Sequence, residues 1–434
     1  MTNILSAVNG IPLENVDYRH DALGRPMTRN ADSFTYNGRG EVTEALVSGS
    51  IETHAYDGIG NHVCSASGAV TNLFVANVLN QYASILNSSM PQCEVMLQYD
   101  LDGNMLFDGV SRHSYDSFSR LKSVSRNGNV VLSNHYDAKS RRVRKITPAA
   151  VTTFFYDGWN LIEERVAGTN GTVSTFRYYW GKDVSGELQG AGGVGGLLYL
   201  TLDDEIYIPL YDGGGNVTKY IDASGNIVAS YTYGAFGQLL SKSGPLADVF
   251  RFRFSTKYYD AETGLYYYGY RFYSTALMRW LNRDPIEEKG GLNLYSLCLN
   301  NVLSSIDPLG LDRYMTTFSF DMNKDQWHVG VAVDTWECQN GIWQKTGIIT
   351  FDYLVDDSAW WKRAGRFVAV AKGVIQERAG LNLIEPFMLS SSPEQDVAML
   401  EQMRKDKSNP PLYNFVFNNC IHWATKAIDY GMDK

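Results

Sequence analysis

The sequence predicts a mainly β scaffold over residues 1–311, followed by a small α+β domain over residues 312–434. Two observations support this division. A tyrosine, usually followed by Asp or Asn and then by a turn, recurs about every 20 residues in the first part of the chain, as in repeat architectures. After Leu311 the density of tyrosine and glycine falls, and patterns typical of helices appear between strand-like runs.

The composition is that of a globular protein. Hydrophobic residues make up 44% and charged residues 20% of the 434 residues, so the chain can bury a sizeable core. The net charge of −9 argues against a surface that coats nucleic acid, because phosphate binding depends on clustered Lys and Arg. One basic run is expected to form a solvated strand face; it consists of Arg141, Arg142, Arg144 and Lys145.

Cysteine usage and hydropathy exclude several further classes. The five cysteines are odd in number and lack metal-ligand spacing, which argues against a disulfide framework or a zinc site. We expect neither a metal nor a cofactor. Residues 1–12 lack the basic region and apolar run of a signal peptide, and no apolar stretch reaches the roughly 18–20 residues needed to span a bilayer. Export is therefore expected to use a dedicated machine, or to occur as part of a longer chain.

The recurring tyrosine motifs are expected to form β-hairpins. Asp-Gly and Asn-Gly supply turns with positive φ, and runs such as 227–231 between the turns are rich in β-branched and aromatic residues. Tyrosine suits the unit because its ring packs while its hydroxyl stays in water. The alternative is an ordinary β-rich domain with chance Tyr-Asp pairs. The motifs are Tyr36-Asn37-Gly38, Tyr56-Asp57-Gly58, Tyr99-Asp100, Tyr115-Asp116, Tyr136-Asp137, Tyr156-Asp157-Gly158 and Tyr211-Asp212-Gly213.

These motifs resemble the YD repeats of Rhs-type polymorphic toxins, which in that family wind into a hollow β-cocoon. Residues 259–311 are similar to the core signature that plugs this shell, from Tyr259-Asp260 through Arg283-Asp284-Pro285 to Asp307-Pro308-Leu309-Gly310-Leu311. The resemblance covers about residues 13–311. Shells of the family are usually far longer, so the chain is expected to be a fragment, an orphan tip or a small variant.

Two Asp-Pro motifs, at Asp284 and Asp307, bracket the end of the scaffold. Taken alone, each would start a turn, because Pro presets φ and Asp binds its own backbone. The resemblance implies instead an aspartyl-protease pair that cuts after Leu311, in which one carboxyl is the acid and the other activates water. The sequence departs from the family pattern at Glu287, where Gly is common, and at Val302, where Pro is common.

Residues 312–434 are expected to alternate strands with helices. The predicted strands are 327–336, 347–354 and 413–417, with a turn at 339–341 between the first two. The predicted helices are 358–379, about 393–407, which has a Ser cap and a Pro in its first turn, and 420–431.

Cys420 is the predicted nucleophile of this domain because it lies at a strand-to-helix junction. Free N–H groups at a helix N-terminus lower a thiol pKa and can hold an oxyanion. The expected base is His328; His422 lies two residues from the thiol, and such positions do not face each other on a helix. Folding the hairpin about residue 339 puts position 350 opposite 328, and Asp352, on the same face as Thr350, is the expected orienting group.

Residues 328–333 followed by 419–423 resemble the circularly permuted papain-like hydrolases related to lecithin:retinol acyltransferase. The resemblance covers about residues 326–352 and 413–431. It implies a thiol that attacks an ester, amide or thioester, as in a peptidase, deamidase, acyltransferase or lipase. The alternative is a structural cysteine and a core histidine, in which case the scaffold displays a non-enzymatic binding module on a cell surface.

The expected function is therefore that of the C-terminal part of a toxin used in competition between bacteria, secreted or delivered into a target cell. The expected partners are an immunity protein, a secretion machine and a target-cell protein or lipid as substrate. No nucleic-acid partner and no stable membrane span are expected.

Overall fold

The computed structural model describes residues 3–8, 11–90, 92–311, 315–316, 327–339, 342–355, 369–379 and 412–415. The chain divides into a unit of residues 1–317 and a unit of residues 318–434, and each is described by itself. Across the described ranges, the helices are three short 3₁₀ turns: η1 (Phe254–Thr256), η2 (Glu287–Gly290) and η3 (Cys298–Asn300). None of the described helices could cross a lipid bilayer, since none has the required length and apolar character.

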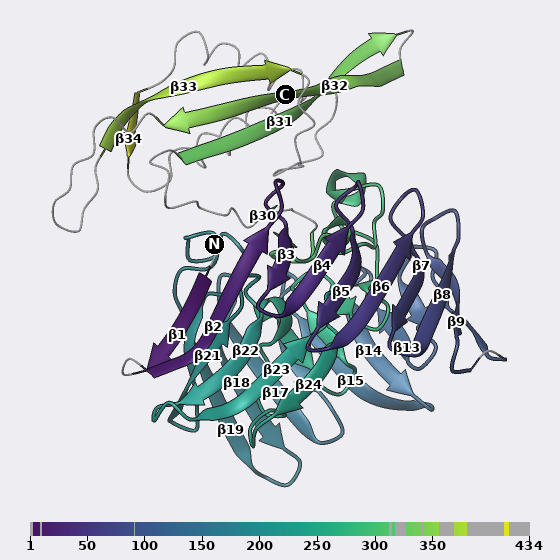
Figure 1. Cartoon of the computed structure of the whole chain (residues 1–434). Coiled ribbons are helices and arrows are strands. Elements are labelled where there is room, and N and C mark those ends of the chain that lie inside the picture. Colours follow the sequence, from purple (N-terminus) through teal and green to yellow (C-terminus); the bar gives the residue numbers. More distant parts are fainter. Residues whose placement is uncertain are drawn as a thin grey trace. The chain divides into compact units, whose positions relative to one another are not determined.

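The first unit contains two large antiparallel sheets, which we call the shell (β1–β24; Figure 1). Each strand pairs with the next one along the chain. The first sheet consists of β1 (Asn3–Val8), β2 (Ile11–His20), β3 (Pro26–Arg29), β4 (Asp32–Tyr36), β5 (Val42–Val47), β6 (Ser50–Tyr56), β7 (His62–Ser67), β8 (Val70–Ala76), β9 (Tyr82–Asn87) and β10 (Glu94–Met96).

The second sheet has fourteen strands in the same sequential order. It consists of β11 (Gln98–Tyr99), β12 (Met105–Phe107), β13 (Arg112–Tyr115), β14 (Leu121–Arg126), β15 (Asn129–Tyr136), β16 (Arg142–Ile146), β17 (Ala150–Asp157), β18 (Asn160–Gly168), β19 (Val173–Trp180), β20 (Leu197–Leu202), β21 (Glu205–Tyr211), β22 (Val217–Asp222), β23 (Ile227–Tyr233) and β24 (Leu239–Ser243). The mainly β prediction for this part of the chain is confirmed.

Six of the seven tyrosine motifs form turns of the shell in one repeated way, and the turn after Tyr156 differs because Asp157 pairs directly with Asn160. In the turn after Tyr56, Oδ1 of Asp57 accepts the N–H groups of Ile59 (3.0 Å) and Asn61 (2.8 Å), and Gly60 has φ +87°. A register shift directly precedes the tyrosine of each of the seven motifs. Because such bulges bend and twist a strand, their regular spacing curves the sheets.

The tyrosine hydroxyls are not in water, so that expectation was wrong. Tyr156 donates its hydroxyl hydrogen to the carbonyl of Arg142 (2.9 Å), and Tyr211 donates to the carbonyl of Leu197 (2.6 Å), each on the preceding strand. Tyr36, Tyr56 and Tyr136 make the equivalent bond. Burial raises the pKa of both Tyr156 and Tyr211 well above the ordinary value. Five of the seven motif tyrosines therefore bond their repeat to the preceding strand through a side chain as well as through the backbone ladder, whereas the hydroxyls of Tyr99 and Tyr115 are buried without a hydrogen bond to any described residue.

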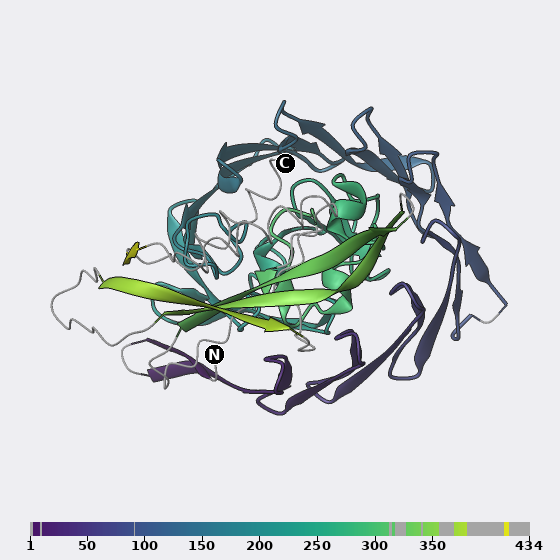
Figure 2. The same cartoon turned by 90° about the horizontal axis from the view of Figure 1, so that it is seen from above.

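Residues 259–311, which we call the plug, lie within the ring of shell strands (Figure 2), and most of their side chains are buried. A four-stranded antiparallel sheet begins with β25 (Tyr258–Asp260) and continues through β26 (Leu265–Tyr267), β27 (Phe272–Ser274) and β28 (Arg279–Trp280). Nearly all of its residues are buried, and Trp280, Tyr266 and Tyr273 are among the largest fully buried side chains. The expectation that this segment plugs the shell is confirmed.

The first sheet and the later part of the second sheet meet through side chains, at a contact we call the seam: Tyr18 on β2 and Arg29 on β3 touch Asp212 and Gly213 in the turn between β21 and β22. Nη1 of Arg29 lies 2.8 Å from Oδ2 of Asp212, across 183 residues of sequence. The N–H of Gly213 donates to the Tyr18 hydroxyl at 2.8 Å. A shell of this short length therefore closes on itself around the plug.

The strands described in the second unit are β31 (Trp327–Gln339), β32 (Ile342–Val355), β33 (Ala369–Ala379) and β34 (Leu412–Phe415), in that order and antiparallel. The expected helix over 358–379 is wrong for its last eleven residues, which form β33. Val370, Val374 and Ile375 favour an extended strand, and pairing with β32 supplies partners for the backbone. The other two expected helices lie outside the described residues, so the α+β prediction is not confirmed.

Candidate functional site

Asp284 and Asp307, the aspartates of the two Asp-Pro motifs, meet at one arginine. Nη2 of Arg271 lies 2.9 Å from Oδ2 of Asp284 and 3.4 Å from Oδ2 of Asp307. All three side chains are buried, and the Arg271 guanidinium lies 4.3 Å from the ring centre of Trp280. The plug thus brings two carboxylates of distant turns onto one buried cation, where electrostatic interactions are strong.

Each aspartate also caps its own turn with its second oxygen. Oδ1 of Asp284 accepts the N–H of Ile286 at 2.9 Å. Oδ1 of Asp307 accepts three N–H groups, from Leu309 (3.1 Å), Gly310 (2.6 Å) and Leu311 (3.1 Å). In each aspartate, Oδ1 therefore caps the turn and Oδ2 contacts Arg271. The turn interpretation and the carboxylate-pair interpretation of the Asp-Pro motifs do not exclude each other.

The loop 307–311 is held from the other side by the plug. The N–H of Tyr270 donates to the carbonyl of Leu309 (3.0 Å), and Nε of Arg271 donates to the carbonyl of Gly310 (2.6 Å). Beyond the loop, β30 (Met315–Thr316) pairs with β29 (Ser305–Ile306). The loop up to Gly310 is thus bonded to the plug, and β30 is paired with the strand that directly precedes Asp307.

Arg271 was missed by the sequence reasoning, although it lies inside the recognised signature. An arginine between Tyr270 and Phe272 in an aromatic-rich run was the available signal, since a cation there must be buried with partners. Glu287, noted as a departure from the family pattern, has φ +58°, a backbone conformation that favours glycine. Its N–H donates to the carbonyl of Asp284 at 3.0 Å.

The remaining predicted site residues lie in the second unit. Cys420 is outside the described residues. His328 is on β31 and Asp352 is on β32, but the register differs from the expected one: Leu354 is opposite His328, and Gly330 is opposite Asp352. Gln339 pairs with Ile342, and a bulge lies between Thr335 and Trp336; together they shift the pairing of His328 away from position 350.

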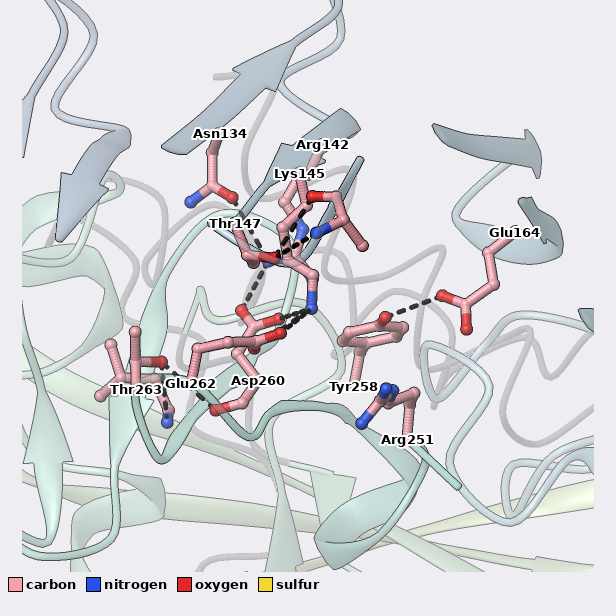
Figure 3. Close-up of polar contacts among 12 residues, drawn as sticks. Asn134, Arg142, Lys145, Thr147, Glu164, Arg251, Tyr258, Asp260, Glu262 and Thr263 are labelled. Atoms are coloured by element: carbon pink, nitrogen blue, oxygen red, sulfur yellow. Dashed lines mark hydrogen bonds and ion pairs between the residues drawn. The ribbon is translucent and has the colours of Figure 1, made fainter. Parts of the chain in front are cut away.

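A second buried charge cluster joins the plug to the shell (Figure 3). Nη1 of Arg142 lies 2.5 Å from Oδ2 of Asp260, and Nζ of Lys145 lies 3.1 Å from Oδ1 of Asp260 and 3.3 Å from Glu262. Burial disfavours the ionised Asp260, but Arg142 and Lys145 outweigh it and hold the pKa of this carboxyl below its ordinary value. Beside the cluster, the Tyr258 hydroxyl donates to Glu164 (2.7 Å).

The expectation of a solvated basic face was therefore wrong for two of its four residues. Arg142 is fully buried and Lys145 is 3% exposed, whereas Arg144 faces solvent. The physical reason is the carboxylates of the plug, which supply counter-charges inside the shell. In the described part of the chain, no group of three or more His, Cys, Asp or Glu residues could hold a metal ion.

Known proteins resemble the first unit. The family model described as Teneurin YD-shell matches residues 28–296. The tRNA3(Ser)-specific nuclease WapA of Bacillus spizizenii is 29% identical over 284 residues, covering 62% of this chain and 11% of that protein. Toxin subunit YenC1 of Yersinia entomophaga is 26% identical over 295 residues, covering 60% of this chain and 29% of that protein. The chain thus spans less than a third of either relative.

A solved structure has the same fold as the first unit. The structure titled TcdB2-TccC3-TEV aligns with a TM-score of 0.56 at 19% identity, covering 69% of this chain and 17% of that chain. The shell with its internal plug is therefore an arrangement that occurs in an experimentally solved protein.

Proposed function

The chain belongs to the Teneurin YD-shell family, and we propose that it is the C-terminal part of a polymorphic toxin that cuts its own backbone after Leu311. The observation that carries the proposal is the pair of buried aspartates that share Arg271 beside the loop ending at Leu311. Relatives named as toxin subunits and nucleases support a toxin whose shell carries a separate effector.

The cleavage is a hydrolysis by two carboxyl groups. One carboxylate takes a proton from a water molecule while the water oxygen bonds to the carbonyl carbon of Leu311. The other, protonated, gives its proton so that the bond to the nitrogen of Asp312 breaks. The products are a carboxylate at Leu311 and an amino group at Asp312. Arg271 contacts both carboxyl groups and so stabilises whichever of the two is ionised at each stage.

Asparagine variants of the two aspartates test this chemistry. In Asp284→Asn and Asp307→Asn the amide oxygen can still accept the N–H bonds of the turn, so we expect folding to persist and cleavage to stop. Asp222→Asn is the matched control, because Asp222 caps an exposed turn through Ser224 and Asn226 and has no role in cleavage. N-terminal sequencing of the small fragment should read Asp312 first. Cleavage that continues in both site variants would refute the aspartyl mechanism.

The released segment, residues 312–434, is proposed to be a thiol-dependent hydrolase or acyltransferase that acts on a protein or lipid of the target cell. Cys420 is the nucleophile, His328 is first its base and then the acid for the leaving group, and Asp352 orients His328. Delivery into the target cell needs a secretion machine, and self-protection needs an immunity protein.

Growth of bacteria that express the full chain in the cytoplasm tests the effector. We expect growth arrest by the wild type, and relief by either Cys420→Ala or His328→Ala, because members of such a pair act as one unit and their double variant is little worse. His422→Ala is the control and should remain toxic. If Cys420→Ala arrests growth at equal expression, the thiol mechanism is wrong. If the wild type does not arrest growth, a non-enzymatic binding module becomes the better assignment.

Nuclease activity is the second candidate, favoured by the tRNA nuclease WapA among the relatives. It predicts cleaved tRNA in arrested cells and arrest that does not depend on Cys420. Electrophoresis of total RNA from the same cultures separates the two candidates. Intact tRNA in arrested cells would reject the nuclease.

A further inference from the structure

We propose that Lys257, together with the backbone at Gly192, is a positioning residue that holds the loop 307–311 in place for self-cleavage. The inference rests on the cleavage proposed above and adds to it a residue outside the aspartate pair. Lys257 lies between η1 and β25, and 5% of it is exposed.

Lys257 joins two segments that are distant in sequence. Its Nζ donates to the carbonyl of Pro308 at 2.7 Å and to the carbonyl of Gly192 at 2.9 Å. The ammonium also lies 5.4 Å from the ring centre of Tyr268. A buried ammonium requires such acceptors, so the two carbonyls and the lysine fix one another.

With Lys257 included, three successive carbonyls of the loop have donors from outside it. Lys257 binds Pro308, the N–H of Tyr270 binds Leu309, and Nε of Arg271 binds Gly310. The next carbonyl along the chain is that of Leu311, where the bond breaks. A reacting group placed by several bonds in a row gains rate because its orientation is set in advance.

Gly192 is the second half of this support. It has φ +60°, and a Cβ added there would lie 2.1 Å from the carbonyl oxygen of Pro308. Its neighbours Ala191 and Gly193 donate their N–H groups to Oδ2 of the buried Asp183, at 2.7 and 3.1 Å. The turn 191–193, which we call the glycine turn, is thus a rigid backbone surface against which the loop 307–311 packs. Only glycine at position 192 allows the carbonyl of Pro308 to come so close.

The charge of Lys257 gives the proposal a readout that a purely structural role lacks. Burial lowers the pKa of Lys257 to about 8, although Asp307 and Asp183 attract its proton. These two carboxylates and Tyr268 are the titratable groups that face it from the loop 307–311, the glycine turn and the plug. Below pH 8 the ammonium holds both carbonyls; above pH 8 the neutral amine holds them more weakly.

The test is the rate at which the purified full chain forms the fragment beginning at Asp312, from pH 6.5 to 9.5. We expect Lys257→Met to slow cleavage about 10- to 100-fold, since small misplacements cost this much. Lys257→Arg keeps the charge, so its rate should exceed that of Lys257→Met and should fall less steeply above pH 8 than the wild-type rate does, because only the titration of the catalytic carboxyl groups remains. Lys242→Met, at an exposed ion pair with Asp248, is the control and should match the wild type.

Gly192→Ala provides a second variant that leaves the lysine in place. It should displace Pro308 and slow cleavage while Lys257 remains. Wild-type rates and an unchanged pH profile in Lys257→Met and Lys257→Arg would overturn the positioning role and leave self-cleavage standing. If Lys257→Met fails to fold, the pH profile of Lys257→Arg decides: a decline above pH 8 equal to that of the wild type overturns the proposal. A wild-type chain that never cleaves would remove the proposed function itself.

Discussion

Arg142, Arg253 and Arg271 are fully buried, and each lies over at least one aromatic ring. The Arg142 guanidinium is 4.9 Å from the ring centre of Tyr258, and that of Arg253 is 4.6 Å from the ring centre of Tyr259. Arginine suits such sites because it is planar, weakly hydrated and able to bind oxygens at its edge while stacking on rings. In this molecule, buried charge is therefore part of how the plug is held inside the shell.

The pair between Arg142 and Asp260 should be costly to break. In Asp260→Asn, Arg142 and Lys145 would lose their shared buried anion, so we expect a loss of about 3–5 kcal/mol in the free energy of unfolding. Urea denaturation measures this. Asp248→Asn, in an exposed pair with Lys242, should change stability little. Equal effects of the two substitutions would show that burial of the first pair has no energetic consequence.

His54 should make the stability of the shell depend on pH. Burial lowers its pKa to about 4, while the unfolded chain protonates near 6.5. The unfolded state therefore binds the extra proton first, so stability is full above pH 6.5 and falls by about 1.4 kcal/mol per unit as the pH drops toward 4. Melting curves of wild type and His54→Leu between pH 7.5 and 4.5 should converge at low pH. His135→Leu, at an exposed position, should keep the wild-type slope; a wild-type slope in His54→Leu would contradict the assignment.

Among single residues, those that belong to a sequence motif are easier to predict from the sequence than those that are charged and buried. Asp284 and Asp307 could be identified from the sequence because each is part of an Asp-Pro motif. The role of Arg271 and the burial of Arg142 could not be predicted in this way, because the carboxylates that neutralise these buried charges are more than ten residues away in the sequence.

The hairpins of the shell depend on their tyrosines as much as on their turns. The hydroxyls of Tyr156 and Tyr211 bond to carbonyls of the preceding strand, so each connects one hairpin strand to its neighbour. The same bond at five of the seven motifs explains why those positions hold a tyrosine and not a phenylalanine. The period and the turn residues predicted the hairpins correctly. The prediction that the tyrosine hydroxyls face water was wrong, because the alternation of side chains along a strand does not distinguish a solvent-exposed hydroxyl from one that faces a neighbouring carbonyl.

Phenylalanine variants test this role of the hydroxyl. Tyr156→Phe and Tyr211→Phe would each leave a carbonyl without its donor, and we expect each to cost about 1–3 kcal/mol in the free energy of unfolding. Tyr179→Phe is the control: Tyr179 is 38% exposed and its ring stacks on Tyr199, a contact that phenylalanine preserves. Urea denaturation of the three variants should therefore separate the first two from the third. If all three match the wild type, the hydroxyl bonds contribute nothing.

In the second unit, β33 shows why helix predictions fail in short segments. Residues 369–379 carry apolar residues at spacings that suit either structure, and pairing with β32 favours the strand. The register of β31 and β32 differed from expectation for a related reason. Gln339 pairs with Ile342, so the hairpin folds further along the chain than residue 339, and the bulge between Thr335 and Trp336 shifts the pairing by one more residue. A bulge leaves little trace in the sequence.

For the whole first unit, closure depends on contacts that the sequence does not reveal. Arg29, on β3, and Asp212, in the turn between β21 and β22, meet at the seam although they are 183 residues apart in the sequence. The repeats predicted a curved shell and the signature predicted its plug. How far a shell of this length curves depends on the sum of many small bends, so the sequence alone does not predict that its two sheets meet at the seam.

The central claim, that this family member cuts itself between Leu311 and Asp312, is tested most directly by the intact mass of the purified wild-type chain after days at neutral pH. We predict two species, residues 1–311 and residues 312–434, whose masses add up to that of the whole chain plus one water molecule. A single species with the mass of all 434 residues would contradict the claim.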